Sequence, residues 1–349
     1  MTSNFLVDQI GDGIERKLQN YIKVAYNKKP SRMKVALNIK AVPSSNIEEM
    51  WKEHQRIISN FNMTYSDATW TLTKKPKFSL VDLKIKILEK IFSSCVLCEH
   101  ECGINRKIEN GYCGVKKSLI SSEFIHMGEE AVLVPSHTIF FSGCNLKCVY
   151  CQNWDISQNP SMGLDIPPEK LAKIIDLRRE QGSLNVNFVG GDPTPHLKYI
   201  FTVMKNSREN IPIVWNSNMY LTEDAMNLLQ CFVDLYLTDY KYGNDACAEK
   251  LSGISNYSEV VRRNHKIANG SGDMIIRHLI LPNHVDCCSK PVLKWIADHL
   301  GNDVVLNIMP QYRPAYKSSE YRDLNVLPTR EEVQEVILYA EALGFVNLI

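Results

Sequence analysis

From about residue 137 onward, the chain alternates between short apolar runs and longer amphipathic runs. The apolar runs, each about the length of one strand, are HTIFFSG, NVNFVGG, PIVWNS, VDLYLTDYK, MIIRHLILP and VVLNIMP. Helical patterns follow them, such as IPPEKLAKIIDLRREQG, with prolines near its start and Gly182 at its end. This alternation predicts an α/β fold with a parallel sheet. Six units are too few for a closed eight-stranded barrel, so we expect a partial (βα)6-type parallel barrel; a doubly wound sheet is the alternative on periodicity alone.

Polar clusters stand directly after each of these six runs. In chain order they are the cysteine loop at 144–151, GGDP at 190–193, NSNM at 216–219, DYK at 239–241, PNH at 282–284 and PQYRP at 310–314. The carboxyl ends of parallel strands share one edge of a sheet, and ligands bind at that edge. We therefore expect these clusters to meet in one functional site.

The first cluster carries three cysteines, Cys144, Cys148 and Cys151, in the spacing C-x3-C-x2-C. Soft thiolates select iron–sulfur clusters, zinc or copper(I). A four-iron cube usually takes four thiolates, so three leave one iron open to a substrate or cofactor. The alternatives are a zinc site completed by a distant histidine, or plain buried cysteines.

A second group of cysteines lies upstream, with the spacing C-x2-C-x3-C-x10-C: Cys95, Cys98, Cys102 and Cys113. Four thiolates complete the coordination of a structural zinc or of an auxiliary iron–sulfur cluster, and the spacing leaves both open. Cys231 and Cys247 are expected to be buried small residues. Cys287 and Cys288 are either a loop pair without chemistry or thiols that donate a hydrogen atom to a substrate.

The segment before the cysteines is expected to be a separate extension. We divide the chain into a mixed, mainly helical N-terminal extension (1–90), a four-cysteine metal module (91–125) and the partial barrel (126–349). SSNIEEMWKEHQRIISNF predicts a helix with a Ser45/Glu48 capping box, and SLVDLKIKILEKIF predicts another. MKVALNIKAV is expected to form a short strand. A scaffold or a lid is the expected role of the extension.

Composition excludes several classes of partner. The 349 residues carry a formal net charge of +1, which gives no electrostatic case for nucleic acid or an anionic membrane. The N-terminus lacks the pattern of a secretory signal, and no apolar run approaches the roughly 18 residues of a spanning helix. We therefore expect a soluble cytoplasmic protein, in which eleven cysteines indicate metal binding or catalysis rather than disulfides.

Seven segments taken together resemble a known family. They are CVLCEHECGINR with GYCG, HMGEE, TIFFSGCNLKCVYCQN, VGGDPTPH, LTDYKYGN, IIRHLILPN and NIMPQYRP. In this order, over about residues 80–345, they are similar to the radical SAM superfamily and its pyruvate formate-lyase activating enzyme-like subfamily. The resemblance implies a [4Fe-4S] cluster on Cys144, Cys148 and Cys151, with S-adenosylmethionine (SAM) chelating the fourth iron.

The resemblance also implies a reaction. A one-electron donor of the flavodoxin or ferredoxin type reduces the cluster, SAM is cleaved, and a 5′-deoxyadenosyl radical abstracts hydrogen. The substrate is either a protein, as in glycyl-radical activation, or a small molecule. The competing function is a non-catalytic iron–sulfur or zinc protein that acts in electron transfer or binding.

Roles for individual cofactor-binding residues follow from the same resemblance. Tyr150 matches the residue near the adenine, and Arg277 the one that meets the SAM carboxylate. Gly190, Gly191 and Asp192 match a GGE motif that meets the methionyl amino group, with Asp in place of Glu. Asp239 and Lys241 match a DxK pair that contacts the cofactor. Asn216 and Asn218 are expected to contact ribose or substrate.

Ordinary structural readings compete with each of these roles. Tyr150 also suits a core position, GGDP a turn, Asp239 with Lys241 an ion pair, and the two asparagines a loop. The family's Pro-x-His contact after the sixth strand is replaced here by Pro310-Gln311-Tyr312, so no histidine role is carried over.

Overall fold

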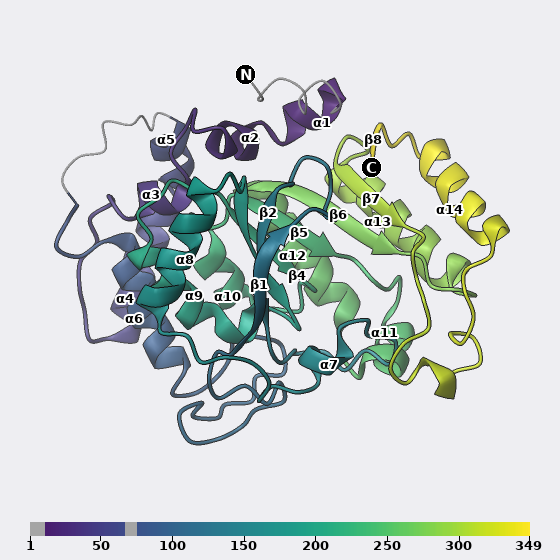
Figure 1. Ribbon diagram of the computed structural model, residues 1–349, viewed down its shortest axis with the longest axis horizontal. Coiled ribbons are helices and arrows are strands. Elements are labelled where there is room, and N and C mark those ends of the chain that lie inside the picture. The colour runs from purple at the N-terminus through teal and green to yellow at the C-terminus, as the bar shows by residue number, and fades with distance from the viewer. Residues whose placement is uncertain (1–10, 67–74) are drawn as a thin grey trace.

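The computed structural model describes residues 11–66 and 75–349. One sheet of eight strands runs through this part of the chain, with the strands side by side in their order along the sequence. The strands are β1 (Ile120–His126), β2 (Ser136–Phe141), β3 (Asn185–Gly190), β4 (Ile213–Ser217), β5 (Leu235–Asp239), β6 (Asp273–Leu279), β7 (Val305–Met309) and β8 (Asn347–Leu348). Only β1 pairs antiparallel with its neighbour, and all later pairs are parallel (Figure 1).

The helices are α1 (Asp12–Lys17), α2 (Gln19–Ala25), α3 (Arg32–Ala36), α4 (Ile47–Ile58), α5 (Phe61–Ser66), α6 (Leu80–Ile91), α7 (Trp154–Ser157), α8 (Pro168–Glu180), α9 (Leu197–Asn206), α10 (Glu223–Leu229), α11 (Asp245–Ser252), α12 (Tyr257–Ser271), α13 (Lys290–Leu300) and α14 (Arg330–Ala342). None of the described helices is long and apolar enough to cross a membrane.

The predicted partial barrel is confirmed. The six predicted strands are β2 to β7, and their order never reverses, so the doubly wound alternative is wrong because it requires a switch point in the strand order. Two strands, β1 and β8, were not predicted. β8 has two residues, too few for any periodicity, and β1 is an antiparallel edge strand whose half-exposed residues lie outside the βα alternation.

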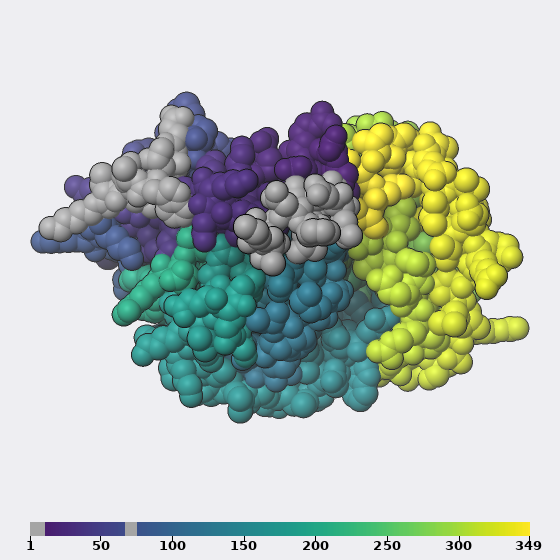
Figure 2. Space-filling model, turned by 45° about the horizontal axis from the view of Figure 1, so that its top comes forward, coloured from purple at the N-terminus to yellow at the C-terminus, as the bar shows by residue number. Residues whose placement is uncertain are grey.

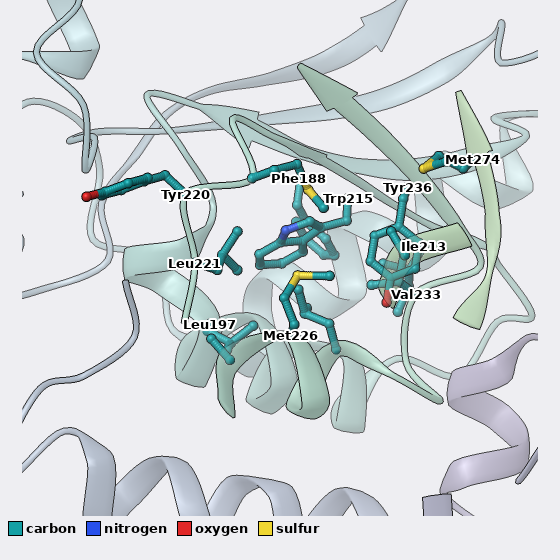
Figure 3. Close-up of a cluster of buried hydrophobic side chains, with 14 of the residues drawn as sticks. Phe188, Leu197, Ile213, Trp215, Tyr220, Leu221, Met226, Val233, Tyr236 and Met274 are labelled. Carbon is teal, nitrogen blue, oxygen red and sulfur yellow. The ribbon is translucent and has the colours of Figure 1, made fainter. Parts of the chain in front are cut away.

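The outer face of the sheet packs against the crossover helices. Trp215 on β4 is fully buried, and Figure 3 shows its indole beside Leu221 and Met226 from the region of α10. Phe188 and Tyr236 occupy the same face of the neighbouring strands. Aromatic side chains bury large apolar areas, so this layer fixes the strands that carry the polar clusters.

The N-terminal segment fills part of the barrel interior. Leu18 and Tyr21 of the α1–α2 region pack against inward-facing side chains of the sheet, among them Val214, Leu237 and Ile275. The backbone N–H of Tyr21 also donates to the Asp273 carboxylate over 2.8 Å. Arg179 of α8 donates to the carbonyl of Ala25 in α2 over 2.7 Å, and Figure 1 shows α2 along one edge of the fold. This part of the extension therefore packs against the inward-facing side of the sheet, and its expected role as a scaffold or a lid stays a prediction.

Two local predictions in the extension are wrong. The strand expected in MKVALNIKAV does not form. Its first four residues belong to the helix α3, which Ser31 caps by accepting a hydrogen bond from the Lys34 N–H, and Lys40 makes only an isolated bridge to Ser79. Helix α4 is capped by Asn46, which accepts from two backbone N–H groups, and not by Ser45. Helix α6 follows SLVDLKIKILEKIF as predicted, with a Ser79/Asp82 capping box.

The expected domain boundaries at 90 and 125 are crossed by packing. One hydrophobic core joins Leu88 of the extension and Leu97 of the four-cysteine segment to Phe188 of the barrel. The Thr222 hydroxyl, just before α10, donates to the backbone carbonyl of Val96 over 2.8 Å. The division into three domains stays a prediction. Residues 1–10 and 67–74 of the extension lie outside the described part of the chain.

Candidate active site

A cavity of about 730 Å³ opens at the carboxyl ends of the barrel strands. Sites for small ligands commonly have volumes of about 300–1,000 Å³. All twelve residues expected for the open cluster and its cofactor line this one cavity: Cys144, Cys148, Tyr150, Cys151, Gly190, Gly191, Asp192, Asn216, Asn218, Asp239, Lys241 and Arg277. Five of the six polar clusters therefore contribute to this cavity, whereas PNH at 282–284 does not.

Both ends of the described chain reach this cavity. Ile14 of α1 and the C-terminal Ile349 belong to its lining. Figure 2 shows the N-terminal helices, in purple, lying against the yellow C-terminal residues. The cavity is thus bounded by the barrel and by part of the N-terminal extension.

The three-cysteine loop follows β2 and presents its sulfur atoms to the cavity. The Leu146 N–H donates to Cys144 Sγ over 3.3 Å, and the Ser252 hydroxyl donates to Cys148 Sγ over 2.9 Å. Cys151 Sγ lies 3.2 Å from the Ser157 hydroxyl. Such donors stabilise thiolate charge once a metal is bound.

Burial alone would keep these thiols protonated. It raises the pKa of Cys144 well above its ordinary value, and it raises that of Cys148 to about 11 although the Lys241 ammonium acts in the opposite direction. A bound metal reverses this balance, because a coordinated thiol is deprotonated. A single ion needs ligand atoms that all lie within about 4.8 Å of one another. Among residues 11–66 and 75–349, these three sulfur atoms do not form such a set. The set therefore fits a cluster with several irons better than a single ion.

Arg277 on β6 is held by two glutamates of the segment between β1 and β2. Its guanidinium contacts Glu130 through Nε at 2.7 Å and Nη2 at 2.6 Å, and Nη2 also contacts Glu129. Asn307 donates to Glu130 over 2.7 Å. Burial opposes ionisation of Glu130, but the Arg277 contacts outweigh it, so the pKa of Glu130 is lowered.

This arrangement differs from the expected role of Arg277. We expected it to await a cofactor carboxylate, but two carboxylates of the chain already pair with it. Sequence reasoning missed Glu129, Glu130 and Asn307, which line the cavity. The HMGEE segment was a signal, since a charged residue inside an apolar strand needs a partner. Only the fold shows that this partner comes from a segment about 150 residues away.

Asp239 and Lys241 form an ion pair at the end of β5. Lys241 Nζ lies 2.6 Å from Asp239 Oδ2, and both side chains are about one-fifth exposed. Burial acts to lower the pKa of Lys241, but Asp239 and the nearby Cys148 outweigh it, so the pKa is raised. Lys241 therefore stays charged and places a positive group beside the cysteine loop.

The glycine pair after β3 serves the chain's own backbone. A Cβ at Gly190 would lie 2.2 Å from the Phe141 nitrogen, and one at Gly191 would lie 2.0 Å from the Gly143 carbonyl oxygen. Gly190 also has a φ of +124°, where other residues are strained. The glycines thus let the GGDP loop pack against β2 and the start of the cysteine loop.

Asp192 joins the ends of β3 and β4. Its buried carboxylate accepts hydrogen bonds from the N–H of Thr194, the hydroxyl of Ser217 and the N–H of Asn218, all at 2.9–3.0 Å. Asn218 in turn donates to Asn145 within the cysteine loop over 2.7 Å. Burial raises the pKa of Asp192, and these donors oppose that rise. Asp192 and Asn218 therefore hold the strand-end loops in place, in addition to any contact that they make with a ligand.

Tyr150 combines a cavity position with a buried hydrogen-bond chain. Its hydroxyl donates to Tyr242 over 2.7 Å, and the Tyr242 hydroxyl lies 2.6 Å from that of Ser252, the residue that donates to Cys148. Burial raises the pKa of Tyr150 well above its ordinary value, so it stays a neutral phenol. These hydrogen bonds link Tyr150, the expected adenine contact, to the thiol of Cys148.

The upstream cysteines lie near one another but outside the cavity. Cys95, Cys102 and Cys113 each act to raise the pKa of Cys98, although burial is the larger cause. Among the described residues, these four are not a set whose ligand atoms all lie within 4.8 Å of one another. One zinc ion would require such closeness, with zinc–sulfur bonds of about 2.3 Å. Zinc and an auxiliary iron–sulfur cluster both stay predictions for these four cysteines.

Comparison with known proteins matches one family model and several relatives. The model described as "Radical SAM superfamily" matches residues 138–296. The "Uncharacterized protein MJ0674" of Methanocaldococcus jannaschii is 45% identical over 333 residues, which are 93% of this chain and 97% of that protein.

Two further relatives are less similar in sequence, and their names describe two different enzymes. Pyruvate formate-lyase 1-activating enzyme of Escherichia coli K12 is 24% identical over 210 residues, 56% of this chain and 84% of that protein. The 7-carboxy-7-deazaguanine synthase of Archaeoglobus fulgidus is 31% identical over 133 residues, 36% of this chain and 52% of that protein.

Proposed function

Because this chain belongs to the radical SAM superfamily, we propose that it cleaves SAM reductively at a [4Fe-4S] cluster held by Cys144, Cys148 and Cys151. When bound, the cluster would supply the electron that breaks the bond between the sulfur and C5′ of SAM. Methionine would leave, and the 5′-deoxyadenosyl radical would take a hydrogen atom from a substrate. The observation that carries this proposal is the convergence of these three thiols and nine further expected residues on one cavity of about 730 Å³.

The chain's own residues then bind, orient and shield the reactants. Tyr150 contributes an apolar wall for the adenine, and the Asp239–Lys241 pair places one charge of each sign beside the cysteines. Arg277 is paired with Glu129 and Glu130. These two carboxylates therefore accept hydrogen bonds from the ribose hydroxyls or the amino group of SAM, while Arg277 positions them.

We propose a small molecule as the substrate. The cavity volume falls in the range of small-ligand sites, and Ile14 of the N-terminal extension contributes to its lining, as expected for an enclosed pocket. Glycyl-radical activation of a protein is the second candidate. The similarity to the E. coli activating enzyme favours it, and with it the activating enzyme-like subfamily, at 24% identity.

The electron donor and the compartment complete the proposal. A flavodoxin or ferredoxin type of donor suits a one-electron reduction, and the upstream cysteines suit an auxiliary cluster on its path. All eleven cysteines are free, which supports a reducing compartment such as the cytoplasm.

Anaerobic reconstitution tests the reaction. The expected result is 5′-deoxyadenosine and methionine, measured by liquid chromatography and mass spectrometry, after dithionite and SAM are added to protein with a full iron and sulfide content. A Cys231→Ser variant is the matched control, because this buried cysteine lies outside the cavity lining. A fully loaded protein that forms no deoxyadenosine would contradict the proposal and favour a non-catalytic iron–sulfur protein.

A second measurement separates the two substrate classes. Cell extract is divided by ultrafiltration into small molecules and proteins, and each fraction is added to the reaction. A small-molecule substrate predicts that the low-mass fraction accelerates deoxyadenosine formation. Acceleration by the protein fraction alone would support glycyl-radical activation instead.

A further inference from the structure

Four side chains outside the cavity lining form a compact group at the ends of β5 and β6. Cys247 comes from α11, and His284, Cys287 and Cys288 come from the segment after β6. Their ligand atoms all lie within 4.8 Å of one another, the one such set of three or more among the described residues. Cys247 was expected to be a buried small residue, and Cys287 and Cys288 a loop pair. The fold instead brings all four residues together, and we name them the Cys3His cluster.

The individual distances resemble the edges of a tetrahedron. Cys287 Sγ lies 3.8 Å from Cys247 Sγ and 4.0 Å from Cys288 Sγ. His284 Nδ1 lies 3.8, 3.2 and 3.9 Å from the sulfurs of Cys247, Cys287 and Cys288.

Tetrahedral zinc has Zn–S bonds of about 2.3 Å and Zn–N bonds of about 2.0–2.1 Å. Its ligand atoms are therefore about 3.8 Å apart for two sulfurs and about 3.6 Å for sulfur and nitrogen. The five distances scatter around these values. A four-iron cluster places each thiolate on a different iron and holds the sulfurs farther apart. We propose that Cys247, His284, Cys287 and Cys288 bind one zinc ion in a closed structural site.

The surroundings of His284 favour coordination through Nδ1. Asp323 Oδ2 lies 3.4 Å from His284 Nε2, on the opposite side of the ring from the sulfurs. Lys250 holds Asp323 through a contact of 2.8 Å. A carboxylate beside one ring nitrogen keeps the proton there and leaves the lone pair of the other nitrogen for a metal. When zinc binds, the cysteine thiols release their protons to solvent.

The backbone around the cluster is built for close approach. Cys287 and Cys288 lie in a π-helical turn, Val285–Ser289. Such turns are rare in proteins, and those that occur are often found at functional sites. Asn244 bridges the two segments: it donates to the Cys287 carbonyl over 2.7 Å and accepts from the Cys247 N–H over 2.9 Å. A Cβ at Gly243 would lie 2.6 Å from the Cys287 carbonyl oxygen, so this contact requires glycine.

The position of the cluster indicates its role. Four protein ligands complete a tetrahedron and leave no open position for substrate, which is the pattern of structural zinc. The ion would pin the segment after β5, which contains Lys241, to the segment after β6. Zinc would thus position one wall of the cavity. This inference does not depend on the proposed reaction.

Metal analysis of the whole chain tests the proposal. The protein is produced in medium with iron and zinc and purified without oxygen, and both metals are counted by mass spectrometry. We expect about one zinc per chain, and in the Cys247→Ser/Cys287→Ser variant at least a tenfold loss of zinc with unchanged iron. Cys231→Ser, a buried cysteine outside every proposed metal site, keeps its zinc. X-ray absorption at the zinc edge gives three sulfurs and one nitrogen in the first shell.

Four results would overturn the inference. The first is iron-loaded protein without zinc, and the second is zinc that persists in the double variant. The third is zinc that is lost only on Cys95→Ser/Cys98→Ser substitution. The fourth is a wild-type mass that is two daltons low and is restored by a reductant, which indicates a disulfide.

A measurement on the wild-type protein covers the case of a variant that fails to fold. Cys247 and Cys287 are only partly buried, so a maleimide reaches them in the folded protein once no metal protects them. Peptide mapping then shows protection with zinc and modification after a zinc chelator. Equal modification before and after chelation contradicts the proposal.

Discussion

The three-cysteine loop and the Cys3His cluster hold the same kind of ligand in opposite surroundings. Cys144, Cys148 and Cys151 face a cavity of about 730 Å³, and their sulfurs are not a single-ion set. The ligand atoms of the Cys3His cluster instead lie within 4.8 Å of one another, outside that cavity's lining. The number of cysteines therefore does not indicate what a site does. The distances between the ligands and the free space beside them distinguish an open site from a closed one.

The two sites also differ in how the sequence encodes them. The open loop is local, with its ligands in eight consecutive residues, so one motif reveals it. The closed cluster joins Cys247 to residues about 40 positions later, and no short motif spans that separation. Local spacing is therefore a useful guide to sites built on one loop, and a poor guide to sites built across two strand ends.

The sharpest test of the comparison removes one thiol of the open site. Cys148→Ala is expected to lower deoxyadenosine formation at least 1,000-fold, because the cluster iron loses a ligand. Zinc content should not change. Parallel iron, zinc and deoxyadenosine measurements check this, with Cys247→Ser as the reciprocal variant. Loss of zinc from Cys148→Ala would show that the two sites are not independent.

The ion-pair network of the cavity gives the next largest effect. Arg277→Met leaves Glu129 and Glu130 buried without a positive partner, which typically costs about 3–5 kcal/mol. We expect a marked fall in the thermal midpoint and weaker SAM binding.

Arg178→Met is the matched control for this change. Arg178 also pairs with a glutamate, Glu123, but its side chain is 29% exposed. The expected cost is about 1 kcal/mol or less. Equal losses in the two variants would contradict the view that the Arg277 network is a buried part of the cavity wall.

Zinc removal should have a moderate effect confined to the closed site. An ion that binds only the folded chain stabilises it by about 2.7 kcal/mol at a free concentration 100 times its Kd. Chelation is therefore expected to lower the thermal midpoint by several degrees and to slow deoxyadenosine formation only a few-fold. Calorimetry with and without chelator measures this. A chelated protein with an unchanged midpoint would contradict a structural role.

The smallest effect concerns Lys84, a buried lysine that neighbours Cys231 and belongs to neither metal site. Burial lowers the pKa of Lys84 to about 8, and its amine lies 2.7 Å from His54 Nε2. The unfolded chain keeps this proton up to a pKa of about 10.4, so it binds more protons between pH 8 and 10. Lys84 therefore adds about 1 kcal/mol of stability as the pH rises from 8 to 9.

Lys84→Met should remove this increment and leave both metals in place. The increment is the difference in pH dependence between wild type and variant, measured by thermal melts at pH 8 and 9. Parallel pH curves for the two proteins would show that Lys84 keeps its ordinary pKa in the folded state.

Much of this protein could be predicted from its sequence because the relevant signals are local. Strand–helix alternation predicts β2 to β7, and five of the six polar clusters that follow these strands line the cavity. The capping box of Thr329 and Glu332 at the start of α14 is another such local signal. These patterns depend on backbone geometry and on the period of apolar residues, which a short stretch of chain already expresses.

Only the tertiary structure decided the partners of these residues. It pairs Arg277 with Glu129 and Glu130, saturates Asp192 with donors of the chain, and places α2 inside the barrel. It also joins Cys247 to His284, Cys287 and Cys288. The physical reason is that charge pairing, burial and metal-ligand distances act through space between distant segments. The sequence determined which side chains reach the end of each strand, and the fold determined what each of them meets there.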